Sequence, residues 1–338
     1  MNTRKKVNNL FFIVLLVNFG VSMLLSVLFL RCDINIYVEL ILSQCTILIP
    51  AFIFLLVNKC ELSDWVPIKK IKFTTVLYIV LFMVLFSPLI TLFNLISQLF
   101  TTNEVAQLSV ELMDMPMIAS VLFIGFVGPF CEEFVFRGVI FHGLKKSGRV
   151  LGAAIITGVF FGLLHLNINQ MFYAIPMGIA FSLLVEATGS ILGSFTAHAT
   201  INTWNSILAI GTVKILKFLG MEDMFSQSAQ ETVTNDILFK AIGAYAVVAV
   251  FSTALAVVVY IAICRNEGNY DKVKNIFVKN KATGGAEAES DEVPCEENLE
   301  KKTPLLTFTG YVAIALCIFV IFFLDKLMEY IFPMIYNG

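Results

Sequence analysis

We predict an all-α membrane protein, a polytopic helix bundle with about eight or nine transmembrane helices. Hydrophobic residues make up 58% of the 338 residues, and the mean hydropathy is +0.85. Charged residues make up 14%, whereas about a quarter is usual in a soluble domain. These charges gather between apolar runs that are long enough to cross a bilayer. The net charge of −2 indicates no basic face for nucleic acid, so we expect no such partner.

Nine apolar segments of roughly 20 residues could cross the hydrocarbon core as helices. The first follows Arg4, Lys5 and Lys6 and in this respect resembles a signal peptide. It is too long for one and lacks a small-residue cleavage site, so we expect a retained helix. In chain order the segments are residues 8–30, 36–57, 73–99, 117–144, 149–166, 171–187, 190–211, 237–264 and 305–325.

Lysine and arginine in the short loops predict the orientation, because cytoplasmic loops are enriched in both. The N-terminus, residues 59–72 and residues 145–149 are basic, whereas the loops around residue 33 and over 101–117 carry no lysine. We therefore expect a cytoplasmic N-terminus. Loops rich in lysine and asparagine favour a bacterial plasma membrane.

Composition divides the chain into five parts. Residues 1–116 hold the N-terminal transmembrane helices, and residues 117–211 hold the chemically active side chains. An outer loop and a transmembrane helix follow over 212–264, and a C-terminal transmembrane helix lies within 305–338. Residues 265–304 are the only long polar stretch, basic first and acidic later, and we expect a disordered cytoplasmic linker there. The seven cysteines form no CxxC pair and are expected to be buried thiols.

Ionisable side chains within the apolar segments mark a candidate site, because a charge at membrane depth costs roughly 2.5–3.5 kcal/mol. Glu132, Glu133 and Arg137 lie in one such segment. On a helix, Glu133 and Arg137 are four residues apart and can form an ion pair. Glu132 points about 100° away, so this carboxylate stays available for chemistry. A purely structural ion pair that locks the bundle is the simpler interpretation of Glu133 and Arg137.

Two further apolar segments each carry one of the three histidines. Phe161 and His165 share one helix face, and His198 and Asn202 share another, because each pair is four residues apart. Polar faces in a bilayer turn inward toward one another. Hydrolysis of a peptide bond needs a base for water and donors for the oxyanion. Glu132 is the natural base, with His165 on the same water and His198 and Asn202 as donors.

Together these motifs resemble the CAAX prenyl protease and bacteriocin-processing (CPBP, or Abi) family of type II CAAX endopeptidases. The resemblance covers about residues 117–211 and implies an intramembrane endopeptidase with a glutamate or metallo mechanism. It implies that Glu132 and His165 activate the water and that His198 and Asn202 stabilise the oxyanion. Glu133, Arg137 and Phe161 would organise the site. The matching motifs are EExxxR at 132–137, FxxxH at 161–165 and HxxxN at 198–202, with Phe136-Arg137-Gly138 and Thr188-Gly189-Ser190-Ile191-Leu192 beside them.

The need for a metal stays open at this point. Glu132, His165 and His198 could bind zinc with a water in the fourth position. The chain has neither HExxH nor another close histidine pair, so we expect no obligatory cofactor. The expected partners are membrane lipid and a membrane-associated, prenylated or otherwise hydrophobic peptide substrate. In a bacterium, peptide processing or bacteriocin self-immunity is the better expectation.

Two other classes of function fit the same composition. A membrane scaffold or regulatory protein would keep these side chains without turnover. A proton-coupled transporter would use the buried carboxylates as a proton relay, but it would leave His198 and Asn202 unexplained, and the sequence has no internal repeat.

Overall fold

The computed structural model describes residues 3–29, 32, 35–101, 115–220, 234–282 and 304–336, and within them every regular element is a helix. This confirms the predicted all-α class. In chain order the elements are α1 (Thr3–Phe29), α2 (Ile36–Val57), α3 (Leu62–Trp65), α4 (Phe73–Ser97), α6 (Met117–Ser120), η1 (Val121–Val127), α7 (Gly128–Glu133), η2 (Phe134–Phe141), α8 (His142–Lys145), α9 (Val150–Leu164), α10 (Ile168–Thr188), α11 (Ile191–Phe218), α13 (Asn235–Asn266), α14 (Tyr270–Ala282) and α16 (Phe308–Tyr336).

Seven helices in the described part of the chain are long and apolar enough to cross a membrane. They correspond to seven of the nine segments expected from the sequence; the other two are α9 and α11. Helix α9 has 15 residues and is about 22 Å long, so it is too short to cross alone. Helix α11 is long enough, but it carries several serine, threonine, asparagine and histidine side chains that lower its hydropathy.

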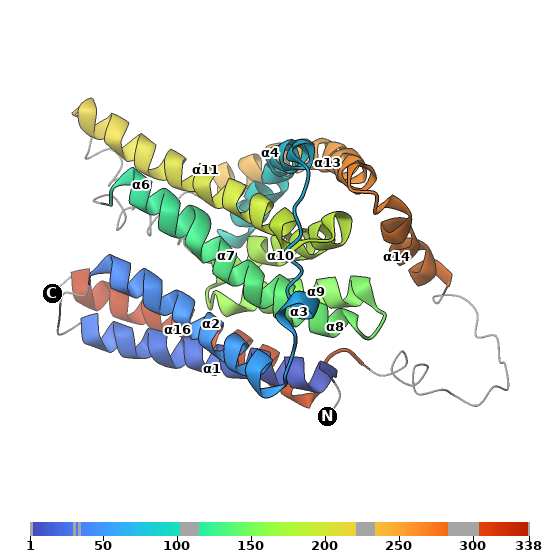
Figure 1. Ribbon diagram of the computed structural model, residues 1–338. Helices are drawn as coiled ribbons and strands as arrows, with labels where there is room; N and C mark the ends of the chain where they lie inside the picture. Colours follow the sequence, from blue (N-terminus) through green and yellow to red (C-terminus); the bar gives the residue numbers. More distant parts are fainter. Residues whose placement is uncertain are drawn as a thin grey trace.

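The helices form three groups (Figure 1). Helices α1, α2 and α16 pack together on one edge, and α4 and α13 pack along each other on the opposite edge. The continuous run from α6 to α8, together with α9, α10 and α11, lies between these edges. The candidate site residues all lie on this central group. The two outer groups therefore shield the site from lipid on two sides.

The central run from Met117 to Lys145 is one long helix interrupted by two π-helical stretches, η1 and η2. A π-helix shifts the hydrogen-bond register by one residue and is frequent at functional sites. The short α-helical segment between them, Gly128–Glu133, carries both glutamates. Pro129 lies at the beginning of this segment, where its missing N–H is tolerated.

Helices α9 and α10 approach each other closely because glycines line their contact. A Cβ atom at Gly178 would lie 2.7 Å from the Cα atom of Gly158 and 3.3 Å from Nη2 of Arg137. A Cβ atom at Gly162 would lie 2.5 Å from Cγ1 of Ile175. Small residues at this spacing let two membrane helices pack backbone against backbone. Because Gly178 has no Cβ atom, the Arg137 side chain also fits beside it.

We expect Gly178→Ala to destabilise the protein by about 1–3 kcal/mol, because the added methyl group meets backbone rather than a movable side chain. Gly243→Ala is the matched control, since a Cβ atom there has nothing within 4 Å. In the middle of a helix this change should be neutral or stabilising by up to about 1 kcal/mol. The free energy of unfolding in mixed micelles measures both. Equal effects of the two substitutions would contradict the close contact.

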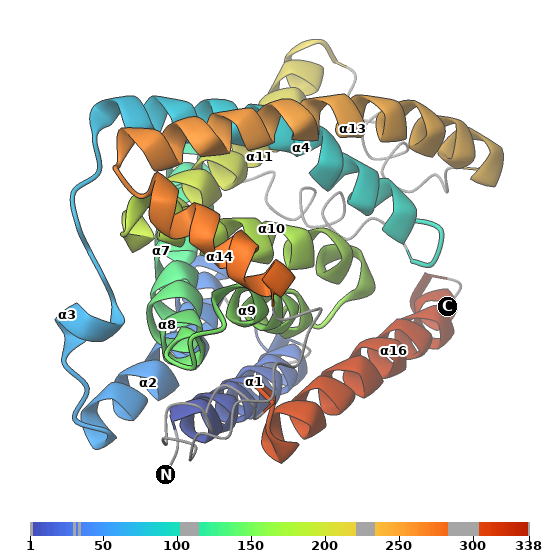
Figure 2. The ribbon, with the colours of Figure 1, turned by 90° about the vertical axis from the view of Figure 1, so that its right-hand side faces the viewer.

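The structure differs from the sequence prediction over residues 265–304. We expected a disordered linker, but α13 continues to Asn266 and residues 270–282 form α14, which lies across the end of α9 and α10 (Figure 2). The helix is held there because Val273 is buried, Lys272 Nζ lies 2.9 Å from Glu186 Oε2, and Asn269 Nδ2 donates to the Ala187 carbonyl. Residues 283–303 lie outside the described residues.

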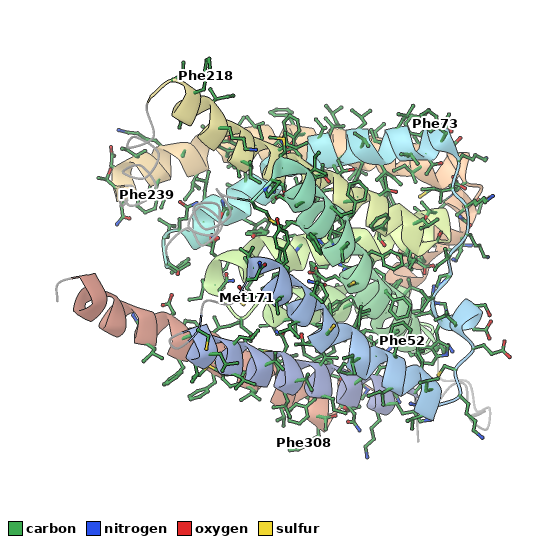
Figure 3. The ribbon with its side chains drawn as sticks, turned by 60° about the vertical axis from the view of Figure 1, so that its left-hand side comes forward. Phe52, Phe73, Met171, Phe218, Phe239 and Phe308 are labelled. Atoms are coloured by element: carbon green, nitrogen blue, oxygen red, sulfur yellow. The ribbon has the colours of Figure 1, made fainter. Side chains whose placement is uncertain are left out.

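Large apolar side chains cover the outside of the bundle. Phe73, Phe218, Phe239 and Phe308 are between 60% and 89% exposed, and they lie at the periphery in Figure 3. In water such side chains would be inside, whereas in a bilayer they face lipid tails at no penalty. The exterior therefore agrees with a polytopic membrane protein.

Candidate active site

The predicted ion pair between Glu133 and Arg137 is present and completely buried. Arg137 Nη1 lies 2.8 Å from Glu133 Oε1, and both side chains have no exposed surface. Arg137 Nη2 also donates to the Gly178 carbonyl at 3.2 Å, which ties the central run to α10. The guanidinium carbon stands 4.4 Å from the ring centre of Phe161. Hence Arg137 is held by a carboxylate, a carbonyl and an aromatic face together.

Glu133 also orients His198, which comes from α11. Nδ1 of His198 lies 2.9 Å from the same oxygen, Oε1, that accepts from Arg137. An imidazole held at Nδ1 by a fixed carboxylate presents its other nitrogen, Nε2, in a defined direction. The His198 ring is buried and packs against the rings of Phe161 and Phe181, with centres 5.7 and 5.1 Å away. The buried ion pair of Glu133 and Arg137 thus fixes the orientation of the His198 ring.

Glu132 lies on the other side of this imidazole. Its Oε2 is 3.8 Å from His198 Nε2, beyond a direct hydrogen bond but close enough for the two groups to interact electrostatically. The Glu132 side chain keeps 23% of its surface exposed, whereas that of Glu133 keeps none. The two adjacent carboxylates therefore have different surroundings: one is fixed and paired, and the other is open.

His165 lies at the C-terminal end of α9, where the chain turns into α10. Its Nδ1 is 2.9 Å from the Phe161 carbonyl, which leaves Nε2 free. The ring packs edge to face on Phe161, with centres 5.1 Å apart. Phe161 thus touches both imidazoles, and His165 lies within electrostatic reach of Glu132 and His198. Because α9 ends at His165, the two imidazoles lie on the same Phe161 ring although they come from different depths of their segments.

The turn after His165 is unusually constrained. Leu166 has a φ of 55°, a left-handed conformation that bulky L-residues rarely adopt. Asn167 begins α10 by accepting a hydrogen bond from Gln170 N at 2.7 Å, and its amide donates to the His165 carbonyl. Asn18 of α1 donates to the Leu164 carbonyl at 3.4 Å. Such a turn fixes the backbone on which the imidazole is mounted.

Asn202 lies one helical turn after His198, as expected. Its Nδ2 donates to the Ile124 carbonyl at 3.2 Å, within the π-helical stretch η1. One N–H of the amide stays available for a ligand. Thr203 also approaches this stretch closely, because Gly125 has no Cβ atom to meet its hydroxyl. Helix α11 is thereby fixed against η1 at the depth of the site.

The structure brings Glu132, Glu133, Arg137, Phe161, His165 and His198 together in one cluster, with Asn202 one turn further along α11. Sequence reasoning missed a set of polar side chains that support it. Asn169 is buried and donates to Asn94 Oδ1 at 2.6 Å and to Ser97 Oγ at 2.8 Å, which joins α10 to α4 just after the His165 turn. Thr46 of α2 donates to Asn18. Asn18 and Asn94 lie within predicted membrane segments, and that was the available signal.

The donor groups do not fit a metal centre in this arrangement. No group of three or more His, Cys, Asp or Glu side chains among the described residues is placed to hold a metal ion. His165 and His198 each use Nδ1 on a protein oxygen, so only two Nε2 atoms and the Glu132 carboxylate remain. Two imidazole nitrogens and one carboxylate are enough to hold zinc when they converge, but the described residues do not place these three groups around one point.

Fold and site together define a polytopic helical membrane protein with a buried site of carboxylates and imidazoles. Residues 114–204 match the family described as type II CAAX prenyl endopeptidase Rce1-like. The Bacillus subtilis (strain 168) protein named "Putative membrane peptidase YdiL" is 32% identical over 88 residues. That match covers 26% of this chain and 36% of the relative, so the chain spans about a third of the relative's length. No solved structure matches the chain.

Both matches fall on the segment that holds the site and agree with the resemblance to the CPBP family seen in its motifs. The matched residues run from just before α6 to the middle of α11 and include every candidate site residue. The helices on either side lie outside the match.

Proposed function

We propose that this protein is an intramembrane endopeptidase that hydrolyses a peptide bond of a membrane-associated protein or peptide. The observation that carries the proposal is the 3.8 Å separation between Glu132 Oε2 and His198 Nε2, with the imidazole fixed by the buried Glu133. A carboxylate that can act as a base and an imidazole of fixed orientation then lie next to each other. The family match over residues 114–204 supports the same reaction class.

In this mechanism Glu132 accepts a proton from the bound water, and the resulting hydroxide attacks the carbonyl carbon of the substrate. His165, whose Nε2 is free, holds the water from the opposite side. The tetrahedral oxyanion receives hydrogen bonds from Nε2–H of protonated His198 and from the Asn202 amide. Glu132 then passes its proton to the leaving nitrogen as the C–N bond breaks.

In the proposed mechanism Glu133 and Arg137 do not touch the substrate. His198 lies between the carboxylates of Glu132 and Glu133, and an oxyanion donor at Nε2 needs the imidazolium form while Nδ1 donates to Glu133. Arg137 keeps Glu133 ionised and in place. The ion pair of Glu133 and Arg137 therefore positions His198. A structural role for the pair and a role in catalysis are compatible.

The test is cleavage by the purified protein in nanodiscs. The substrates are peptides with an apolar membrane anchor, offered with and without a prenylated C-terminus and analysed by mass spectrometry. We expect cleavage at one peptide bond near the membrane surface. Peptides that stay intact in every form, with the protein folded, would contradict the proposal. Faster cleavage of the prenylated peptides would assign a CAAX-type substrate; equal rates would favour general peptide processing.

We expect no obligatory metal for this reaction, because the donor groups do not form a metal centre. Cleavage rates after treatment with EDTA or 1,10-phenanthroline should stay within about twofold of the untreated rate, a change far below the factor of 100 or more expected from loss of a catalytic group. A metal content measurement on the same sample accompanies the assay. Loss of activity that zinc restores would overturn this part of the mechanism and favour a metal held by Glu132, His165 and His198.

A further inference from the structure

An apolar groove runs between α1 and α2 on the outside of the bundle. It has a volume of about 630 Å³, within the range of sites that hold small molecules. Its walls include Ile13, Val21, Ile49 and Ile53, and of these Ile13, Ile49 and Ile53 are each about half exposed. Figures 1 and 3 show α1 and α2 side by side over this length. The groove is thus open to the surrounding bilayer.

The length of the groove suits a single lipid chain. On α1 it reaches from Lys6 to Val21, and 15 residues of helix span about 22 Å. One leaflet of the hydrocarbon core is about 15 Å thick. A fully extended acyl chain of one leaflet can therefore lie in the groove along its whole length.

Positive charge and polar groups gather at one end only, the end at which α1 begins. Lys6, Asn9 and Asn58 line the groove there. Lys146 stands 4.2 Å from the ring centre of Trp65, and that ring packs on Phe54 in the groove wall. Tryptophan and lysine together are typical of the membrane interface. This end of the groove therefore lies at headgroup depth.

The charges of Lys6 and Lys146 both reach the Cys60 thiol, which follows α2. Burial raises the pKa of the Cys60 thiol, and the charges of Lys146 and Lys6 oppose that rise, so both lysines lie within electrostatic reach of this thiol. Neither lysine has a carboxylate partner among the described residues. Lys6 lines the mouth of the apolar groove, and Lys146 stands over the Trp65 ring that packs on Phe54 of the groove wall. Positive charge at this end favours an anion that carries a long apolar chain.

We propose that the groove between α1 and α2 binds an anionic glycerophospholipid, with one acyl chain along the groove and the phosphate on Lys6 and Lys146. The lipid comes from the leaflet that the beginning of α1 faces. This site is separate from the proposed peptidase activity, and its occupancy can be measured without any cleavage assay.

Native mass spectrometry of the detergent-purified full chain tests the site. Phosphatidylglycerol and phosphatidylcholine with identical chains are added separately, and Kd is measured for each. The wild type should bind phosphatidylglycerol at least fivefold more tightly. In Lys6→Gln/Lys146→Gln the affinity for phosphatidylglycerol should fall about 25-fold, because each lysine near an anionic lipid contributes about a fivefold factor. Lys5→Gln removes the same charge one residue away and should change nothing.

A second pair of variants tests the groove itself. Ile49→Trp fills the groove and should weaken binding of both lipids about tenfold or more. Ile41→Trp adds the same bulk to an equally exposed position of α2 that does not line the groove, and should bind as the wild type. Thermal unfolding confirms that each variant is folded. If the double lysine variant does not fold, the Kd of Lys6→Gln for phosphatidylglycerol is compared with that of the wild type instead. Equal affinity for the two lipids in the wild type, or equal effects of a variant and its control, would overturn the proposal.

Discussion

Replacing Glu132 with Gln is expected to lower kcat/KM for peptide cleavage by about 10²–10⁴-fold, because the amide cannot accept a proton from water. The side chain keeps its shape, and 23% of it is exposed, so the folded state should be little affected. Cleavage of an anchored peptide and the thermal unfolding temperature are measured on the same preparation. The expected result is an inactive protein with an unchanged unfolding temperature.

Glu61→Gln is the matched control for this substitution. Glu61 is exposed, lies before α3 and makes no side-chain capping bond, so its replacement should leave kcat/KM unchanged. A Glu132→Gln protein that cleaves as fast as the wild type would exclude Glu132 as the base. A wild type that does not cleave but takes up a solute along a pH gradient would instead favour a proton-coupled transporter. Indifference of every function to Glu132 would favour a scaffold.

Replacing Arg137 with Met is expected to destabilise the protein by about 3–5 kcal/mol, because it leaves the Glu133 carboxylate buried without its cation. The contact with the Gly178 carbonyl and the ring of Phe161 is lost as well. The free energy of unfolding in mixed micelles measures the effect. Arg265→Met, at an exposed arginine, is the control and should change stability by less than about 0.5 kcal/mol.

The double variant Glu133→Gln/Arg137→Met separates charge from packing. With both charges removed, much of the lost stability should return, since the penalty of an unpaired buried charge disappears. Activity should stay low, because His198 loses the carboxylate that fixes its Nδ1. A double variant no more stable than Arg137→Met, or one with wild-type activity, would contradict the role of the pair as a support for His198.

The motifs around Glu132, His165 and His198 predicted which side chains meet, because helical spacing places Glu133 with Arg137 and Phe161 with His165. The two π-helical stretches could not be predicted, since π-helices have no distinct periodicity and depend on tertiary packing. The support of His165 by Asn18 and Asn169 could not be predicted either. These bonds join α9 and α10 to α1 and α4, and helical spacing contains no information on contacts so distant in sequence.

Composition predicted the all-α membrane fold correctly, but it did not predict helix α14 or the short length of helix α9. Helix α14 lies within the polar stretch of residues 265–304, yet Val273 and the ion pair of Lys272 with Glu186 hold it against the bundle. Helix α9 looked like a spanning segment because all of its residues are apolar or small. It ends at His165 because Leu166 adopts a left-handed conformation and Asn167 begins the next helix.

In the proposed mechanism Glu132 and His165 act on the same water, and a double-mutant cycle tests this. Single-turnover cleavage rates are measured for the wild type, Glu132→Gln, His165→Gln and the double variant. Groups that act on one water are strongly non-additive, so the double variant should be within about tenfold of Glu132→Gln alone. Losses that multiply, so that the double variant is slower by the product of the two single effects, would show independent action and contradict the shared water.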